Sequence, residues 1–574
     1  MVIPSAFLCI GALGVFASHS APAQSKDHES ALEETGDATH AGSGAPQGQG
    51  RVAAFARDSW TLGRATAGCL ANRSLVLPFF WGPIFRPVPH VRASQPLGHL
   101  RFTPQETDAF VRAAHQTPNG VATFWAGPFP MVYAATNQAR RELVRESHVG
   151  VVDQASAQYL DGMTGGNQVM ATFPAFRVID SATNKSPIYK AQRRFLLARF
   201  HGGAKQRLPE IAETAAAFLR QYAEERGQLP RPLRELVTGL VLHTSSHLLG
   251  LTKVTLDGPY FGRLEFRHAI GRVARYGISE RADPAYEATL HDLFLETFAS
   301  NFEPISGSTA ETSLIRNLFD SMDQPFPRTF EEFTRYPGPV RHAIAMNFAS
   351  TGLGGMVHST ANTLDWAIAR LLAEPSQMDR LAQLMAEHQE LDLTGEGVFD
   401  QDGPLFPLAE WVLHNVFLYP PFSHQFFLNK QPFTATLADG SKLEVPSMSF
   451  TVVNYAECNR SEERMASADT FSEALRCPRT VENFIMDPRV ASFGGSKVSK
   501  DNPKSRLCPG AKTSLYEQMI ILGILLRDYS LQLTDPKGLS CAADPKEHPL
   551  CSRVNQGQVV LARRQPGPVD VSLR

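Results

Sequence analysis

The feature that most constrains this chain is a long run of helical periodicity from Arg341 to Ala373, closed by Glu374-Pro375. At a rise of 1.5 Å per residue, such a helix would extend about 50 Å. A helix of that length must cross the domain that contains it. Gly352, Gly354 and Gly355 lie in the middle of the run, and each costs on the order of 1 kcal/mol relative to alanine.

Something must compensate for these glycines, and the sequence leaves two explanations open. The backbone would be accessible to a flat ligand or a bound small molecule pressed against the helix. Alternatively, the small residues would let a neighbouring helix approach closely. A dinucleotide-binding loop is excluded, because Val357 occupies the third glycine position and no strand leads into the run.

A second feature is Cys508, in the sequence Arg506-Leu507-Cys508-Pro509-Gly510, with Glu517 nine residues further on. A cysteine thiolate in this setting suits the axial position of a haem iron, where it donates electron density and favours O–O cleavage. Gly510 would remove a side chain where the backbone passes the macrocycle. The alternative is a core cysteine that precedes a helix.

The residues after Cys508 predict a buried amphipathic helix over 512–528 that would fix the direction of the sulfur. Further helices are expected at 104–116, 208–226, 230–249 and 376–389. Strands are expected at Val121 to Phe124, at Phe433 to Leu437 and Leu443 to Val445 around the turn Asp439-Gly440, and at Met448 to Val453. The predicted fold class is therefore mainly α with small β-sheets (α+β).

Here a resemblance becomes specific. The run Gly355-Met356-Val357-His358-Ser359-Thr360-Ala361-Asn362-Thr363 looks like the central helix of the cytochrome P-450 superfamily. The Cys508 segment with Glu517 resembles that family's haem-binding loop, and Tyr419-Pro420-Pro421 resembles the segment after its K helix. The resemblance covers about residues 75 to 535 and implies a cytochrome P-450-like fold.

The resemblance implies haem b, iron protoporphyrin, with Cys508 as its axial thiolate and metal ligand. Arg506 would neutralise a haem propionate. Tyr189 and Arg193 resemble the family's Trp-x-x-x-Arg propionate contact, although Arg193 also lies in a basic patch of the kind that is often only solvated. Phe493 and Gly510 complete the expected cofactor-binding set.

Three departures from the family pattern bear on activity. His358 and Ser359 stand where the family usually carries an acid and a threonine that deliver protons to dioxygen; a histidine with a pKa near 6.5 retains that capacity. His358 is equally compatible with a structural role on the helix face.

The family's Glu-x-x-Arg falls on His414 to Phe417 and is absent, so other contacts must brace the core on the haem side. An insertion at Lys497 to Lys504 separates Phe493 from the cysteine loop.

Three functions remain open. The first is monooxygenation of a small apolar organic substrate with O2, in which His358 and Ser359 are catalytic and electrons come from a separate donor protein. The second is peroxygenase, isomerase or dehydratase chemistry on a peroxide or preactivated substrate, which needs no donor. The third is a non-catalytic haem- or ligand-binding protein.

Net charge and the N-terminal sequence limit the partners and the cellular location that we expect for this protein. The 574 residues carry 55 basic and 57 acidic side chains, a net charge of -2, so a nucleic-acid partner is not expected. Residues 1–23 are expected to be a signal peptide or short membrane anchor: Val2 to Ala17 is apolar, and Ala21-Pro22-Ala23 resembles a cleavage site. This predicts the secretory pathway, either secreted or associated with the endoplasmic reticulum membrane, and is compatible with peripheral membrane association.

The remaining domain boundaries follow from composition. Residues 24–50 hold almost no large apolar side chain and are expected to be a disordered leader. Residues 51–535 would form the haem-thiolate domain, and 536–574 a loosely ordered tail. Asn459-Arg460-Ser461 fits the glycosylation acceptor pattern, as do the sequences at Asn72 and Asn184, but the pattern is common by chance.

Overall fold

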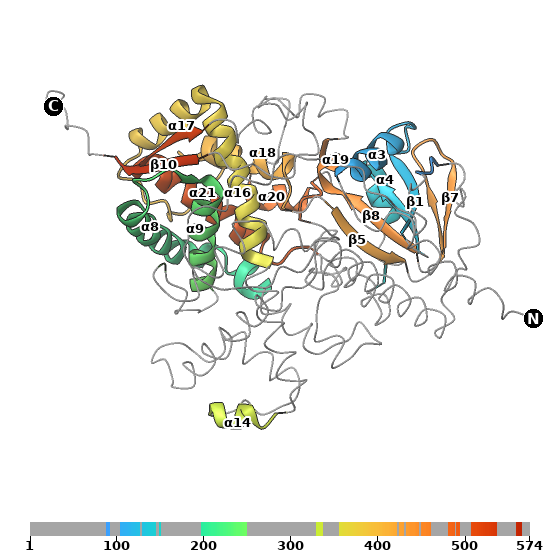
Figure 1. Ribbon diagram of the computed structural model, residues 1–574, viewed down its shortest axis with the longest axis horizontal. Coiled ribbons are helices and arrows are strands. Elements are labelled where there is room, and N and C mark those ends of the chain that lie inside the picture. Colours follow the sequence, from blue (N-terminus) through green and yellow to red (C-terminus); the bar gives the residue numbers. More distant parts are fainter. Residues whose placement is uncertain are drawn as a thin grey trace, which may run out of the picture. The chain divides into compact units, whose positions relative to one another are not determined.

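The computed structural model is mainly helical, with small β-sheets, as the sequence predicts (Figure 1). All described residues belong to one compact unit that spans residues 58–574. The residues described are 88–91, 104–126, 129–144, 149–150, 197–248, 256, 329–336, 355–421, 424–429, 432–446, 449–460, 480–487, 490–493, 507–535 and 558–564.

The large helices lie close to their expected positions. The prediction of six helical segments is confirmed within the described residues, with ends that differ by a few positions. They are α3 (Pro104–Ala114), α8 (Leu208–Glu225), α9 (Leu233–Leu248), α16 (Gly355–Ala373), α17 (Pro375–Glu387) and α21 (Ala511–Asp528). The first half of the long run, 341–354, lies outside the described residues. Its predicted stop at Glu374-Pro375 is confirmed, because Pro375 opens α17.

Helix α21 is largely buried. Fourteen of its 18 residues are buried, and it packs against α8, α16, α17 and α18 (Phe406–Leu418). A Cβ added at Gly523 would lie 3.3 Å from Leu393 Cδ1 and 3.5 Å from Leu408 Cδ2. The missing side chain therefore permits close packing at this point.

Helix α18 was not predicted from hydrophobic periodicity, although the resemblance implied a helix directly before Tyr419. Ten of its 13 residues are buried, so apolar side chains occur on all its faces and produce no amphipathic stripe. Pro407 lies in its first turn, and Tyr419 follows its last residue. Such a helix is difficult to distinguish from a buried strand by periodicity alone.

A buried ion pair joins α9 to α16. Arg234 Nη1 lies 3.0 Å from Asp365 Oδ2, and the Asp365 side chain is only 2% exposed. The same nitrogen also donates to Asn362 Oδ1 at 3.4 Å. Burial raises the pKa of Asp365, against the opposing effect of Arg234. The pair fixes the rotation of two helices whose contact is otherwise largely apolar.

The largest sheet has five strands in the order β1-β2-β8-β5-β3. The strands are β1 (Val121–Ala126), β2 (Phe129–Ala134), β3 (Val149–Gly150), β5 (His424–Asn429) and β8 (Ser449–Asn454). The predictions for β1 and β8 are confirmed. Strand β2 was missed because Pro130 interrupts its pattern; that proline lies near the start of the strand, opposite Trp125.

A two-stranded hairpin confirms the expected turn at Asp439-Gly440. Strand β6 (Phe433–Thr436) pairs with β7 (Lys442–Val445), and burial alternates along both. Gly440 has a φ of 80°, a conformation that favours glycine. The Asn119 side chain donates to Asp439 Oδ2 at 2.9 Å and ties the turn to the residues before β1.

One segment of the C-terminal tail, 536–574, forms regular structure, although the sequence predicts a loosely ordered tail. Gln558–Arg563 forms β10, the middle strand of a sheet in the order β4-β10-β9, with β4 at Arg231–Pro232 and β9 at Tyr529–Asp535. Val559 and Leu561 are buried. The expectation of loose order is thus wrong for these six residues, because their alternating apolar side chains pack on the helical core.

The remaining described elements are short. They are α4 (Asn137–Leu143), α14 (Phe330–Thr334), α19 (Tyr455–Arg460), α20 (Val481–Met486), the π-helix η2 (Leu197–Gly202) and the 3-10 helix η3 (Lys205–Arg207).

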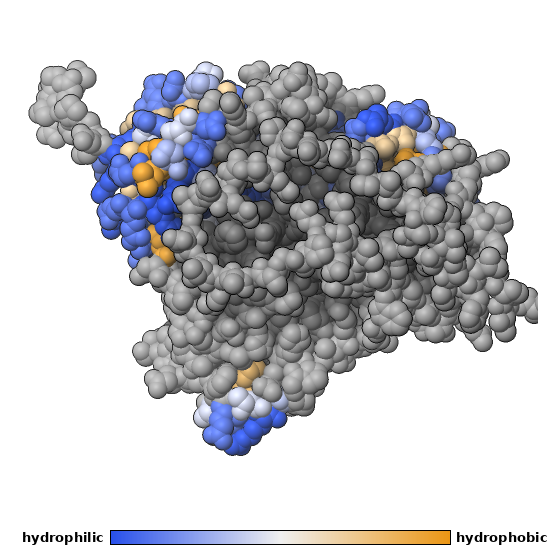
Figure 2. Space-filling model, viewed as in Figure 1, coloured by the Kyte–Doolittle hydropathy of each residue, from blue (hydrophilic) through white to orange (hydrophobic). Residues whose placement is uncertain are grey.

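The surface of the described elements is mostly hydrophilic, with isolated apolar residues (Figure 2). Leu229, at 62% exposure, is the only large hydrophobic side chain that is exposed among the described residues. Within the same residues, no helix combines the length and the apolar character needed to cross a bilayer.

The Arg234–Asp365 pair yields a stability prediction. Asp365→Ala leaves a guanidinium in the core without its carboxylate and should lower the free energy of unfolding by about 3–5 kcal/mol. Urea denaturation measures this. The matched control is Glu331→Ala, which breaks the exposed Glu331–Arg335 pair on α14 and should cost no more than about 0.5 kcal/mol. Equal losses in the two variants would contradict a structural role for the buried pair.

Candidate functional site

The structure joins Cys508 to Phe493, two residues that the sequence predicts in one cofactor-binding loop. The Cys508 amide donates to the Phe493 carbonyl at 3.0 Å, and the Cys508 carbonyl accepts from the Ala511 amide at 3.3 Å. Leu507 and Phe493 are buried, whereas Cys508 is only partly buried. The loop therefore presents its sulfur at the edge of the core, directly before α21. Residues 494–506, with Arg506 and the insertion, lie outside the described residues.

Gly510 leaves space beside this loop. A Cβ built on Gly510 would meet no described atom within 4 Å. Its φ is -90°, which any residue can adopt, so backbone conformation does not require glycine here. Among the described residues, no atom covers this side of the loop. This fits a flat group that lies against the backbone beside Cys508.

Helix α16 is tied to the start of α21. The hydroxyls of Thr360 and Ser514 lie 2.8 Å apart; Thr360 is five residues after Gly355, and Ser514 is six residues after Cys508. The glycine-led end of α16 and the cysteine loop are therefore held within one region of the core. The predicted catalytic pair lies on the same part of α16.

Of this pair, Ser359 is partly buried and donates to the Met356 carbonyl at 3.4 Å. The Ser359 carbonyl accepts from Thr363 Oγ1 at 3.3 Å. Its hydroxyl is thus associated with its own helix. His358 lies in α16 between Val357 and Ser359, and its side chain lies outside the described part of the molecule.

The segment expected to hold the second propionate contact is described only from its C-terminal side. Tyr189 and Arg193 lie outside the described residues. Four residues after Arg193, the π-helix η2 begins, and its Phe200 carbonyl accepts from Thr513 Oγ1 at 2.7 Å. This bond fastens the chain that follows Arg193 to the first turn of α21.

A different set of contacts occupies the region of the missing Glu-x-x-Arg. Asn415, in α18, accepts from Arg370 Nη1 of α16 at 3.2 Å. The Arg370 side chain is 2% exposed, lies 3.0 Å from Glu374 Oε1, and its guanidinium carbon lies 5.1 Å from the centre of the Trp411 ring. Trp411 Nε1 in turn donates to the Ala367 carbonyl at 3.1 Å. Arg370 therefore forms its ion pair at the end of its own helix and joins α16 to α18 through the neutral Asn415 side chain and the Trp411 ring.

The last carbonyls of α18 receive side-chain donors from two other segments. Ser492 Oγ donates to the Val416 carbonyl at 2.9 Å, Asn459 Nδ2 to Phe417 at 2.7 Å, and Arg460 Nη2 to Leu418 at 3.3 Å. A helix end leaves such carbonyls without partners in its own helix. Three donors satisfy them here and fix the entry to Tyr419.

Asn459 is the centre of this arrangement. It is fully buried, and it bonds Ser492 Oγ at 2.9 Å and the Ala491 amide at 2.7 Å in addition to Phe417. The glycosylation pattern at this position therefore does not describe an acceptor in the folded chain. Neither Asn72 nor Asn184 lies within the described residues.

The aromatic residue of Tyr419-Pro420-Pro421 is also held firmly. The rings of Tyr419 and Trp366 stack with centroids 4.0 Å apart, and the Arg460 guanidinium lies 5.6 Å from the Tyr419 centroid. A buried tyrosine between an indole and a cation gains stacking and cation–π stabilisation. These contacts continue the brace from α16 to the segment beyond α18.

Glu517 joins α21 to α9. Its side chain is 1% exposed and accepts a hydrogen bond from the Thr244 hydroxyl. Burial raises the pKa of Glu517 to about 7, against the opposing effect of the Thr244 hydroxyl. The carboxyl group thus changes its protonation near neutral pH inside the core.

Several of these residues were not found from the sequence. Arg370 carried the clearest signal, because it is the one charged side chain in the apolar stretch 366–373 and a buried charge requires a partner. Asn459, Ser492 and Thr244 carry no recognisable pattern, since their roles depend on carbonyls and carboxyls distant in the chain.

Metal-ligating side chains do not converge elsewhere in the described chain: no three His, Cys, Asp or Glu residues form such a group there. A haem iron with one cysteine ligand requires no such convergence.

Comparison with family models gives no match for this chain, and comparison with curated proteins gives none either.

Glu517 predicts a specific dependence of stability on pH. Its folded-state pKa of about 7 exceeds the ordinary value of 4.5, so the stability it contributes is full below pH 4.5 and is lost as the pH rises to 7. The loss should be about 3 kcal/mol. Glu517→Gln, which keeps an acceptor for Thr244, should lack this loss. Urea denaturation of both proteins at pH 4.5, 6 and 8 measures the difference. A constant difference between wild type and variant across this range would contradict the assignment.

Proposed function

We propose that this protein is a haem-thiolate oxidoreductase with a cytochrome P-450-like fold, and that it inserts oxygen into a small apolar organic substrate. The observation that carries the proposal is the Cys508 loop: the backbone bond to Phe493, a partly buried Cys508 and a Gly510 with no described atom beside it occur together at the start of a buried helix. The sequence resemblance supplies the family.

In this proposal the cysteine loop holds haem b through the Cys508 thiolate. When bound, the haem supplies activation of O2 or peroxide. Arg506, Arg193 and Tyr189 bind the propionates, where an Arg can pair with a carboxylate through two parallel hydrogen bonds. Leu507 and the first turn of α21 exclude water from the rear of the loop.

His358 and Ser359 form the proposed proton-delivery pair on α16. The link between Thr360 and Ser514 supports this role, because it fixes the adjacent turn of α16 relative to the cysteine loop. A histidine changes charge near neutral pH and can pass a proton onward through a serine hydroxyl. The apolar substrate would lie on the side of the haem that faces α16.

The proposed monooxygenase needs a separate electron-donor protein, and the secretory pathway is its proposed location.

A second candidate is peroxide-driven or rearrangement chemistry, catalysed by a peroxygenase, isomerase or dehydratase. The Ser359 hydroxyl donates to the Met356 carbonyl of its own helix. A hydroxyl held in this way is less available for a proton relay, which favours this second candidate. A non-catalytic haem- or ligand-binding protein is the third.

The ligand assignment has a direct spectroscopic test. The purified full-length protein, reduced under carbon monoxide, should show the red-shifted absorption band of a thiolate-ligated haem, and Cys508→Ala should abolish it. Cys458→Ala is the matched control: Cys458 is buried in α19 beside the carbonyls of Ala134 and Thr136, so the control should retain the band. Retention of the band in Cys508→Ala would refute the assignment.

Turnover assays separate the candidate reactions. With O2, NADPH and a reductase, His358→Ala should lower product formation by about 10²-fold, since a positioned proton donor contributes at least that much. With an added hydroperoxide the variant should match wild type. His388→Ala, at the end of α17, is the control for loss of a histidine. Product with hydroperoxide alone identifies the second candidate; bound haem without product under either condition identifies the third.

A further inference from the structure

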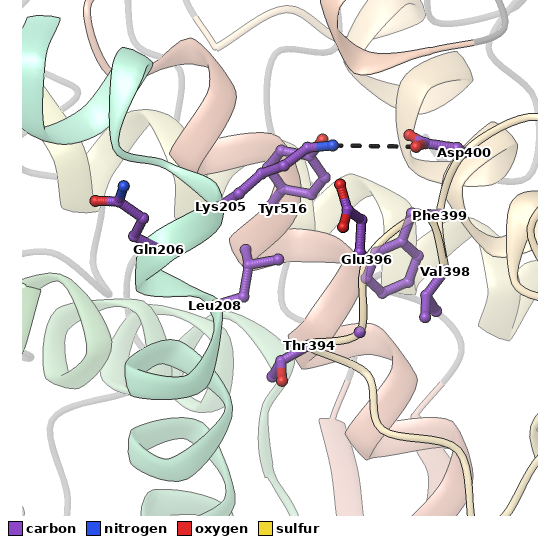
Figure 3. Close-up of a pocket in the computed structure, with 11 residues that line it drawn as sticks. Lys205, Gln206, Leu208, Thr394, Glu396, Val398, Phe399, Asp400 and Tyr516 are labelled. Atoms are coloured by element: carbon purple, nitrogen blue, oxygen red, sulfur yellow. Dashed lines mark ion pairs between the residues drawn. The ribbon is translucent and has the colours of Figure 1, made fainter.

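A pocket of about 250 Å³ lies between η3, the loop that joins α17 to α18, and α21 (Figure 3). Leu208, Val398 and Phe399 supply its apolar part, and Tyr516 of α21 adds an aromatic ring. Lys205, Glu396 and Asp400 supply its charged groups. The pocket is distinct from the cysteine loop, and its existence does not rest on the haem assignment.

Tyr516 brings an unsatisfied polar group to this pocket. Its side chain is 2% exposed, and its hydroxyl has no hydrogen-bond partner among the described residues. Burial raises the pKa of Tyr516, so the phenol stays neutral. A buried hydroxyl without a partner costs free energy that a bound polar group would recover.

The charges around the pocket favour a cation. Lys205 Nζ lies 4.0 Å from Asp400 Oδ2, so these two groups largely offset each other. Glu396 has no ion-pair partner within the described part of the chain. In the view of Figure 3 its carboxylate lies between the rings of Tyr516 and Phe399. Residues 389–403 contain five acidic side chains and no Lys or Arg, which adds to the negative potential.

The loop that carries Glu396 is held in one conformation. Its backbone closes through bonds from Asp400 to Gly397 at 3.0 Å, Gly403 to Asp400 at 2.8 Å and Leu405 to Val398 at 3.0 Å. Gly397 has a φ of 75°, and a Cβ at Gly403 would lie 2.1 Å from the Gly397 carbonyl oxygen. The backbone that carries Glu396 is therefore held in place, and its exposed side chain is accessible to a ligand.

We propose that this pocket binds a small aromatic ammonium compound, with the ammonium at Glu396 and the Tyr516 hydroxyl and the ring against Phe399. An organic cation fits better than a metal ion, because Glu396 is the single carboxylate of the pocket lining outside the Lys205–Asp400 pair, and Tyr516 and Phe399 line the same pocket. An anion would have to compete with Asp400 for Lys205 and would face Glu396. Aromatic faces add cation–π attraction to the ion pair.

Three probes of matched shape test the charge preference: 2-phenylethylamine, 2-phenylethanol and phenylacetate. Calorimetric titration of the full-length protein should show the ammonium binding at least about ten-fold more tightly than the other two. Glu396→Gln should remove that preference. Tyr516→Phe keeps the ring and should weaken ammonium binding about three-fold or more. Glu390→Gln, an exposed acid of the same loop, should bind like wild type.

Other results overturn the proposal. Equal affinity of wild type and Glu396→Gln for the ammonium would show that the carboxylate does not bind it. Tightest binding of phenylacetate would assign the pocket to anions at Lys205. Ammonium binding that is lost in Cys508→Ala but kept in Glu396→Gln would place the amine at the haem instead. Because Glu396→Gln and Cys508→Ala separate the pocket from the haem, failure of this site leaves the proposed function testable on its own.

Discussion

The burial of α21 is the constraint on which the rest of the structure depends. Apolar side chains surround it, yet it also carries polar groups whose partners lie in other segments: Ser514 with Thr360 of α16, Thr513 with the Phe200 carbonyl, and Glu517 with Thr244 of α9. Cys508 lies directly before its first turn. Any movement of α21 would therefore move the sulfur, because the Cys508 carbonyl is bonded to the Ala511 amide that begins the helix.

The core around α18 is braced without a Glu-x-x-Arg pair. Arg370 reaches from α16 to Asn415, and three side-chain donors bond the carbonyls at the end of α18. Ser492 and Asn459 donate as neutral groups, whereas Arg370 and Arg460 donate from charged guanidinium groups. Arg370 remains charged, and Glu374 together with the Trp411 ring stabilises that charge. The absence of the family pair is thus compatible with an ordered core.

The sequence predicted elements whose signal is local. The helices at α8, α9, α17 and α21 and the Asp439-Gly440 turn were correctly located, since periodicity and turn chemistry are carried by adjacent residues. Periodicity missed strand β2 and helix α18: Pro130 breaks one pattern, and burial on all faces removes the stripe from the other. Of the candidate site, Phe493 and Cys508 were both named as cofactor-binding residues, but the role of Asn459 was not expected, because its partners Phe417, Ala491 and Ser492 come from two segments distant in the sequence.

The polar groups of α21 also determine how this helix is rotated about its axis in the native structure. A helix that is apolar on every face packs nearly as well after a rotation, so apolar burial alone specifies its register weakly. Rotation of α21 would separate Glu517 from Thr244 and Ser514 from Thr360, and would leave a carboxyl and hydroxyls buried without partners. Each such group costs about 1–3 kcal/mol. These bonds therefore select a single rotation of α21 out of several similar apolar packings, and that rotation sets the direction in which Cys508 faces.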